Sequence, residues 1–188
     1  MAKFAEDDHN MIEDNIYNKE NKMTPQKFTQ KYTIIQLFEN IDDGYEFTSD
    51  TWPLHSTLVD TFAIDWSVGE MVVHLNEVLL KHAKASSTVT GSDSFGAQKQ
   101  VQVSLLERTD DLMCLHMDVI KTLERGGLKL NDPQYAKEGF LPHATDQKHA
   151  KLDIGDKVNF NAISIVDMFP NGNPYGRKIL KTIKIGNI

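Results

Sequence analysis

Two short segments of the chain repeat one pattern, and that repeat limits the folds open to the chain more than any other feature. "WPLHSTLVD" spans residues 52–60 and "GFLPHATDQK" spans residues 139–148. Each places a histidine, a small residue and a threonine in succession, close behind a proline and a leucine. A shuffled chain of this composition would contain about half a His-x-Thr triplet by chance. Two triplets in matching surroundings therefore indicate two related halves.

Both triplets lie in runs that favour extended strands, where residues i and i+2 face the same side. His55 and Thr57 would then point together, and so would His143 and Thr145. The small residue in the middle of each triplet would face the opposite side, where it can pack against helices. If the two strands face each other across a cleft, two imidazoles and two hydroxyls converge there.

The rest of the chain predicts an α+β fold. One helix is expected from Ser67, which opens a capping box, to about Ala85, and a second from Thr109 to the "ERGG" stop at 124–127. Residues 85–97, "ASSTVTGSDSFGA", are interpreted as a polar, turn-rich loop. This order of elements fits sheets that are not parallel. Strands are expected in six β-branched, aromatic or alternating runs: 31–39, 53–64, 99–107, 140–147, 158–169 and 177–185.

Length and composition favour one globular domain. Of the 188 residues, we expect 31–188 to form that domain, behind a polar arm or helix at 1–30. A net charge of −7 argues against an extended nucleic-acid groove but allows a small phosphate-bearing substrate.

Cys114 lies on an apolar helical stripe, which predicts a core position rather than a nucleophile. With no signal peptide and no run of about 18 apolar residues, we expect a cytoplasmic protein without membrane association.

The paired triplets suit metal-free chemistry on a phosphodiester. One neutral histidine can take a proton from a nucleophilic hydroxyl or water, and the other, protonated, can give one to the departing oxygen. The threonine hydroxyls can donate hydrogen bonds to the non-bridging phosphate oxygens and counter the developing charge. This chemistry needs neither a metal nor a cofactor, and we expect none.

Two His-x-Thr motifs, each on a strand in its own half, resemble the two-histidine (2H) phosphoesterase superfamily, which includes 2′-5′ RNA ligase-like proteins and cyclic phosphodiesterases. The resemblance covers residues 31–188. It implies two antiparallel sheets flanked by helices in a bilobal, pseudo-two-fold arrangement, with a cleft between the lobes. It also implies cleavage of 2′,3′-cyclic phosphates or 2′-5′ linkages, with the two histidines as the acid–base pair and the two threonines as phosphate holders. Asp146, next to the second triplet, stands where the family usually has an apolar residue; strand alternation should point it away from the cleft.

Five further residues are candidates for binding the substrate. Tyr175, at the end of a turn-rich loop, could stack a base, and Trp52 or Phe140 could do the same or simply pack. Arg177 and Lys148 could supply positive charge or could be solvated surface residues.

The other histidines have plainer interpretations. His74, His82 and His116 lie beside helical core stripes, which favours structural roles, whereas His149 is close enough to the second triplet to approach the cleft rim.

Several alternatives stay open. An enzyme of the same chemistry could open cyclic oligonucleotide signals, or join RNA ends in the reverse direction. The fold could also serve as a nucleotide- or RNA-binding module without turnover, which histidine-to-alanine variants would reveal. A metal-dependent hydrolase that uses the histidines as ligands would be sensitive to EDTA. The sequence does not indicate an oligomeric state.

Overall fold

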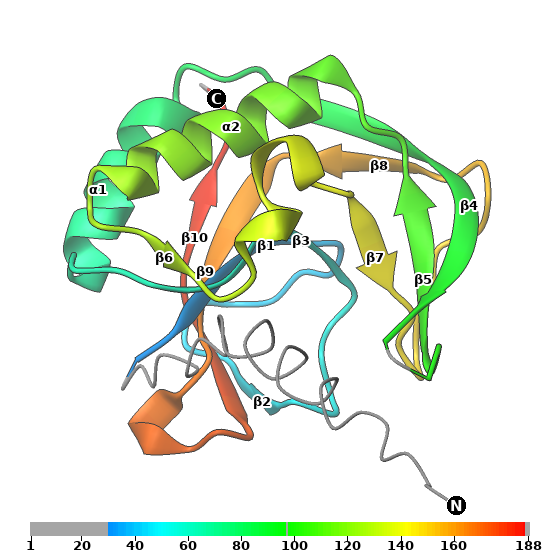
Figure 1. Cartoon of the computed structure of the whole chain (residues 1–188), viewed down its shortest axis with the longest axis horizontal. Helices are drawn as coiled ribbons and strands as arrows, with labels where there is room; N and C mark the ends of the chain where they lie inside the picture. Colours follow the sequence, from blue (N-terminus) through cyan, green and yellow to red (C-terminus); the bar gives the residue numbers. More distant parts are fainter. Residues whose placement is uncertain (1–29, 97, 187–188) are drawn as a thin grey trace, which may run out of the picture.

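Antiparallel strands form most of the protein. The structure, a computed structural model, describes residues 30–96 and 98–186 (Figure 1). The sheet has the order β2-β10-β9-β1-β3-β7-β5-β4-β8, and β6 pairs with β3. The strands are β1 (Tyr32–Leu37), β2 (Glu46–Thr48), β3 (His55–Ala63), β4 (Ala85–Phe95), β5 (Val101–Leu106), β6 (Lys129–Leu130), β7 (His143–Thr145), β8 (Lys157–Phe160), β9 (Ala162–Asp167) and β10 (Gly176–Lys184).

The sheet divides into two lobes at the contact between β3 and β7. One lobe holds β1, β2, β3, β6, β9 and β10, and the other holds β4, β5, β7 and β8. Within the sheet, a single residue pair of β3 and β7, Ser56 with Ala144, joins them. The predicted α+β class and its two antiparallel parts are confirmed, and the lobes are continuous through this one pair.

Two helices cover one side of the sheet (Figure 1). α1 (Val68–Leu79) has the predicted capping box at Ser67, and α2 (Asp110–Glu124) begins behind Thr109, whose hydroxyl accepts from the Leu112 amide. α1 packs on β10 and on α2, and α2 packs on β3 and β4. Three short 3-10 turns complete the fold: η1 (Pro133–Tyr135), η2 (Lys137–Gly139) and η3 (Pro170–Gly172).

The main core lies between the helices and the sheet. Its fully buried side chains each contribute about 1.5–3 kcal/mol relative to exposure. Leucine and valine residues at helical spacing in the second predicted helix, Leu112, Leu115, Val119 and Leu123, predict a buried stripe, and all four are buried. The buried apolar helix residues are Met71, Leu75, Leu79, Leu112, Leu115, Val119, Ile120 and Leu123.

One predicted element type and two predicted extents were wrong, and the strand expected at 140–147 is limited to His143–Thr145, β7. Residues 85–97 do not form a loop, because Ala85–Phe95 is the longest strand, β4; Ala85, Ser87 and Val89 point inward, and the polar residues between them are more exposed. α1 ends at Leu79 instead of near Ala85.

One long strand prediction proves to be two strands in different lobes. The run at 158–169 splits at Asn161 into β8, which pairs with β4, and β9, which pairs with β1 and β10. The buried Gln36 holds the break: its Oε1 accepts hydrogen bonds from the amides of Asn161 and Ala162 at 3.0 and 3.1 Å.

Three other predictions concern the N-terminal arm, the position of Cys114 and membrane association. Residues 1–29 of the predicted N-terminal arm lie outside the described residues. Cys114 is exposed on α2, so its predicted core position was wrong. Within residues 30–96 and 98–186, no helix is long and apolar enough to cross a membrane.

Candidate active site

The fold brings the two His-x-Thr triplets side by side. Ser56 and Ala144, their middle residues, are partners in the β3–β7 pair, and both are fully buried. In an antiparallel pair, this register sets each histidine beside the threonine of the other triplet. Alternation along the strands turns all four of these side chains to the face opposite Ser56 and Ala144. The predicted convergence of two imidazoles and two hydroxyls therefore has a structural basis.

Each triplet strand also has an equivalent neighbour in its own lobe. β1 flanks β3 and β5 flanks β7, and in both cases a leucine stands opposite the histidine and a β-branched residue opposite the threonine. The pairs are Leu37 with His55, Ile35 with Thr57, Leu105 with His143 and Val103 with Thr145. This repeated register agrees with the predicted pseudo-two-fold relation between the lobes.

The two histidines are held by the same local hydrogen bond. His55 Nδ1 lies 2.8 Å from the carbonyl oxygen of Pro53, and His143 Nδ1 lies 2.8 Å from that of Leu141. Because a carbonyl only accepts, Nδ1 carries the hydrogen in both rings. Nε2 of each neutral ring is then the nitrogen left to exchange a proton with a ligand.

The surroundings of the two rings differ. His55 is 9% exposed and lies against Trp52, with ring centroids 4.7 Å apart. His143 is half-buried and meets the edge of Phe95, with centroids 4.9 Å apart. One lobe thus presents an enclosed imidazole and the other a more open one.

Burial is the main influence on the buried imidazole. Desolvation lowers the pKa of His55 below its usual value of 6.5, and the charge of His143 lowers it further. The hydrogen bond to Pro53 and the carboxylate of Glu39 act in the opposite direction and only partly offset this. His55 is therefore biased toward its neutral form.

Glu39 joins the two lobes beside His55. Its Oε1 accepts hydrogen bonds from the Leu54 amide at 2.5 Å and from His149 Nε2 at 3.0 Å. Burial raises the pKa of Glu39, but these two hydrogen bonds and the charges of His149 and His55 outweigh it and lower the pKa overall. His149 thus contacts Glu39, and its predicted place at the cleft rim stays a prediction; no pattern in the sequence marks Glu39.

A cavity of about 580 Å³ borders one residue of each triplet, whereas His55 and Thr145 are not among the residues that line it. Thr57 and His143 line it, and so do three aromatic residues from different elements, Phe95, Tyr135 and Phe140. A volume of this size lies within the range of small-molecule sites. No local sequence pattern marks Phe95 or Tyr135 as site residues, because none shows that β4 and η1 meet there.

Phe140 lines this cavity, and the ring of His116 packs against it and holds its position. It is 5% exposed and stacks on His116, with centroids 4.1 Å apart and planes within 4°. His116 Nδ1 donates to the Leu58 carbonyl, and Nε2 accepts from the Lys137 amide, both at 2.8 Å. Burial, with a smaller contribution from the charge of Arg108, lowers the pKa of His116. The structural role predicted for His116 is confirmed.

Trp52 and Arg177 form a stack behind His55. The Arg177 guanidinium lies 5.8 Å from the Trp52 ring centroid, and Trp52 in turn packs on Phe47. Arg177 Nη1 donates to the carbonyls of Met168, Pro174 and Gly176 at 3.1, 2.9 and 2.6 Å, and burial lowers the pKa of Arg177. The Nη1 group therefore holds the β9–β10 loop, whereas Nε is buried and has no hydrogen-bond partner among the described residues.

The other two candidate binding residues are on the surface. Tyr175 is 71% exposed and is not among the residues that line the cavity. Lys148 is exposed and forms no hydrogen bond or ion pair with the described residues. Their roles as substrate contacts stay predictions.

Asp146 points away from the triplet side chains. Its Oδ1 accepts a hydrogen bond from Ser104 Oγ at 3.1 Å, and Ser104 is the β5 partner of Ala144. The carboxylate thus lies on the face of the small middle residues, as strand alternation predicts.

Comparison with known proteins supports this architecture. The sequence matches no protein-family model and no curated protein sequence. Among solved structures, a phosphoesterase matches with a TM-score of 0.50 and 13% identity, over 84% of this chain and 99% of that one. E. coli LigT complexed with 3′-AMP matches with a TM-score of 0.50 and 13% identity, over 84% of this chain and 98% of that one. The fold implied by the paired triplets is therefore confirmed over most of the chain.

Proposed function

We propose that the protein is a metal-independent phosphodiesterase that cleaves 2′,3′-cyclic phosphates or 2′-5′ linkages in nucleotides or short RNA. The observation that carries this proposal is the pairing of Ser56 with Ala144, which sets the two triplets side by side. Each histidine there keeps Nε2 available while Nδ1 is held by a backbone carbonyl. A nucleotide-binding phosphoesterase-type enzyme also agrees with the fold shared with LigT, which was crystallised with 3′-AMP.

The geometry supports a division of labour between the histidines. His55, biased toward its neutral form by burial, takes a proton from the attacking water through Nε2. The water oxygen bonds to phosphorus, the bond from phosphorus to the 2′ or 3′ oxygen breaks, and His143 gives that oxygen a proton. Thr57 and Thr145 donate hydrogen bonds to the non-bridging oxygens. No step requires a metal.

The acid side of the pH–rate profile is expected to lie below pH 6.5, because burial lowers the pKa of the base, His55. As pH falls, protonation removes the base, and a lowered pKa delays that loss. Glu39→Gln should move this limb to lower pH, since the Glu39 carboxylate favours the charged imidazole. The measurement is kcat/KM from about pH 4.5 to 8; a limb above 6.5, or a shift to higher pH in the variant, contradicts the assignment.

The cavity beside His143 suits the nucleoside part of the substrate. Tyr135 is 60% exposed at its edge, and Phe95 and Phe140 add further aromatic surface. Lys99 also lines the cavity and can balance a second phosphate. Because the net charge is −7, we expect a nucleotide or a short RNA end rather than a long nucleic acid.

Tyr135→Ala is expected to raise KM by about 5- to 150-fold, the equivalent of the 1–3 kcal/mol of one base–aromatic stack. Tyr175→Ala is the matched control, because Tyr175 is exposed and does not line the cavity. Steady-state kinetics of both variants on a 2′,3′-cyclic mononucleotide show which of the two tyrosines contacts the base. A larger effect at Tyr175 would favour the loop at 169–177 as the base-binding element instead.

The substrate class is tested with EDTA-treated protein and a panel of phosphodiesters. The panel holds the four 2′,3′-cyclic mononucleotides, a 2′-5′ dinucleotide, its 3′-5′ isomer and cyclic dinucleotides, with products separated by chromatography. Turnover of the first two classes supports the proposal, and turnover of cyclic dinucleotides alone replaces it with a signal-degrading enzyme. Loss of all activity in EDTA would indicate a metal-dependent hydrolase.

Two further outcomes are distinguished in the same assay. Tight nucleotide binding without turnover would indicate a binding module on the same fold. Formation of a linkage from a 2′,3′-cyclic end and a free hydroxyl would show ligation, the reverse of the same acid–base chemistry. A cytoplasmic location, which gives access to RNA ends, stays a prediction.

A further inference from the structure

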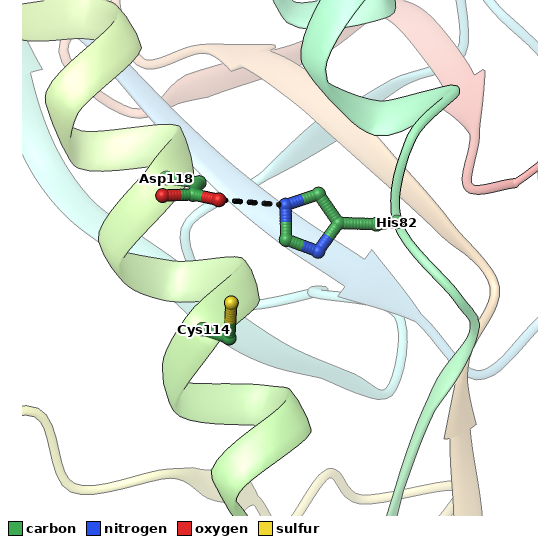
Figure 2. A group of neighbouring side chains, drawn as sticks. All are labelled: His82, Cys114 and Asp118. Carbon is green, nitrogen blue, oxygen red and sulfur yellow. Dashed lines mark hydrogen bonds and ion pairs between the residues drawn. The ribbon is translucent and has the colours of Figure 1, made fainter.

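A second group of reactive side chains lies at the helices, outside the triplet site. One ligand atom each from His82, Cys114 and Asp118 lies within 4.8 Å of the others (Figure 2). Cys114 and Asp118 are one turn apart on α2, which places them on the same face of the helix. His82 comes from the segment just after α1 and points toward both (Figure 2). Thus two elements that are distant in sequence supply an imidazole, a thiol and a carboxylate to one point.

The spacing of these groups is close to that of a zinc site. His82 Nε2 and Asp118 Oδ2 are 3.1 Å apart. Two ligands of a tetrahedral zinc ion lie about 3.3–3.6 Å apart, given bonds of about 2.0–2.3 Å. The Cys114 sulfur is within 4.8 Å of both atoms, and rotation of its exposed side chain can close the remaining gap. The three groups therefore need only side-chain movement to reach coordination distance.

The group also has room for an ion and a fourth ligand. It borders a hollow of about 350 Å³, which Asp111 and Lys81 line as well. Asp111 stands three residues before Cys114, on the same stripe of α2. A water molecule or Asp111 can complete a tetrahedral set there.

We propose that His82, Cys114 and Asp118 bind one Zn²⁺ ion, which links the segment just after α1 to the middle of α2. A thiolate, an imidazole and a carboxylate favour zinc over the hard cations magnesium and calcium, which prefer oxygen ligands alone. On binding, the Cys114 thiol releases its proton to solvent, and the two anionic ligands balance the charge of the ion. This site is separate from the triplets and does not depend on the proposed phosphodiesterase.

Cobalt(II) provides a direct probe, because sulfur-to-cobalt charge transfer gives an absorption band that oxygen and nitrogen ligands do not. The chain has one cysteine, so such a band can arise only from Cys114. We expect one equivalent of Co²⁺ to produce the band and Zn²⁺ to displace it. Cys114→Ser should abolish the band. His82→Gln and Asp118→Asn should weaken binding by more than about a hundredfold, since losing a hydrogen-bonding partner of a ligand alone costs about 10–100-fold.

His74→Gln is the matched control, because His74 lies on α1, close in sequence to His82, but contacts Arg125 and Trp66 instead. It should bind Co²⁺ as the unmodified chain does. Zn²⁺ should also raise the Tm of the unmodified chain and leave that of Cys114→Ser unchanged.

The proposal is overturned if no charge-transfer band forms, or if His82→Gln and Asp118→Asn bind as tightly as the unmodified chain. One metal per two chains would also overturn it, since a site shared between copies would then hold the ion. Cys114→Ser should retain full phosphodiesterase turnover in EDTA. Failure of the zinc site and failure of the proposed function are therefore separate results.

Discussion

Replacing either triplet histidine with alanine is expected to lower kcat on the preferred phosphodiester by about 10²–10⁴-fold, the usual contribution of a positioned acid or base. His55→Ala removes the proton acceptor, and His143→Ala removes the proton donor. Nucleotide binding should change little in both variants, because the threonine hydroxyls and the cavity remain. The measurement is steady-state turnover in EDTA, paired with a direct titration of a nucleotide.

The matched controls are His74→Ala and His149→Ala. His74 stacks on Trp66 over α1, so its removal should leave kcat unchanged. His149 hydrogen-bonds to Glu39, which influences His55, so its variant should shift the pH profile more than the maximal rate. If His55→Ala or His143→Ala turned over substrate like the unmodified chain, the acid–base assignment would be wrong.

Phe140→Ala is expected to cost about 3–5 kcal/mol of folding free energy, the range for deleting a buried aromatic side chain. Phe140 is 5% exposed and stacks face to face on His116, which ties α2 to β3 and to η2. Its loss leaves a cavity behind the site and frees the His116 ring. Urea unfolding of the variant, monitored by circular dichroism, measures this directly.

Two variants separate packing from substrate contact at this position. Phe140→Leu keeps most of the volume and should lose less than about 1.5 kcal/mol. Tyr135→Ala removes a more exposed aromatic residue and should change stability by about 0.5 kcal/mol or less. If Phe140→Ala were as stable as the unmodified chain but had a raised KM, Phe140 would act mainly by stacking on the substrate.

Sequence patterns predicted the elements that have strong local signals. Ser67 and Thr109 begin the two helices because their hydroxyls cap them, and the β-branched run at 32–37 pairs in the middle of the sheet. β4 was missed because it has a solvent-facing side and is rich in serine and threonine, so its composition is that of a loop. The split at Asn161 was missed because it depends on Gln36, which lies 125 residues away.

The candidate site divides in the same way. The two histidines and two threonines of the triplets could be predicted from the sequence, because strand alternation places them on one face. The assignment of Glu39, Phe95 and Tyr135 to the site depends on how β1, β4 and η1 meet in three dimensions. Cys114 shows the converse error, because an apolar neighbourhood along α2 suggested burial at a position that faces solvent. Local periodicity gives the faces of an element but not what covers them.

The measurement that tests the central claim most directly is a titration of the imidazole nitrogens by ¹⁵N NMR, with EDTA present. Signals are assigned with His55→Ala and His143→Ala, and 3′-AMP is added as the ligand. If the triplets form one site, Nε2 of His55 and of His143 shift together, with one dissociation constant and one equivalent of nucleotide, while His74 does not move. If only one of the two shifts, if they follow different dissociation constants, or if neither responds, the two triplets do not form one phosphate-binding site.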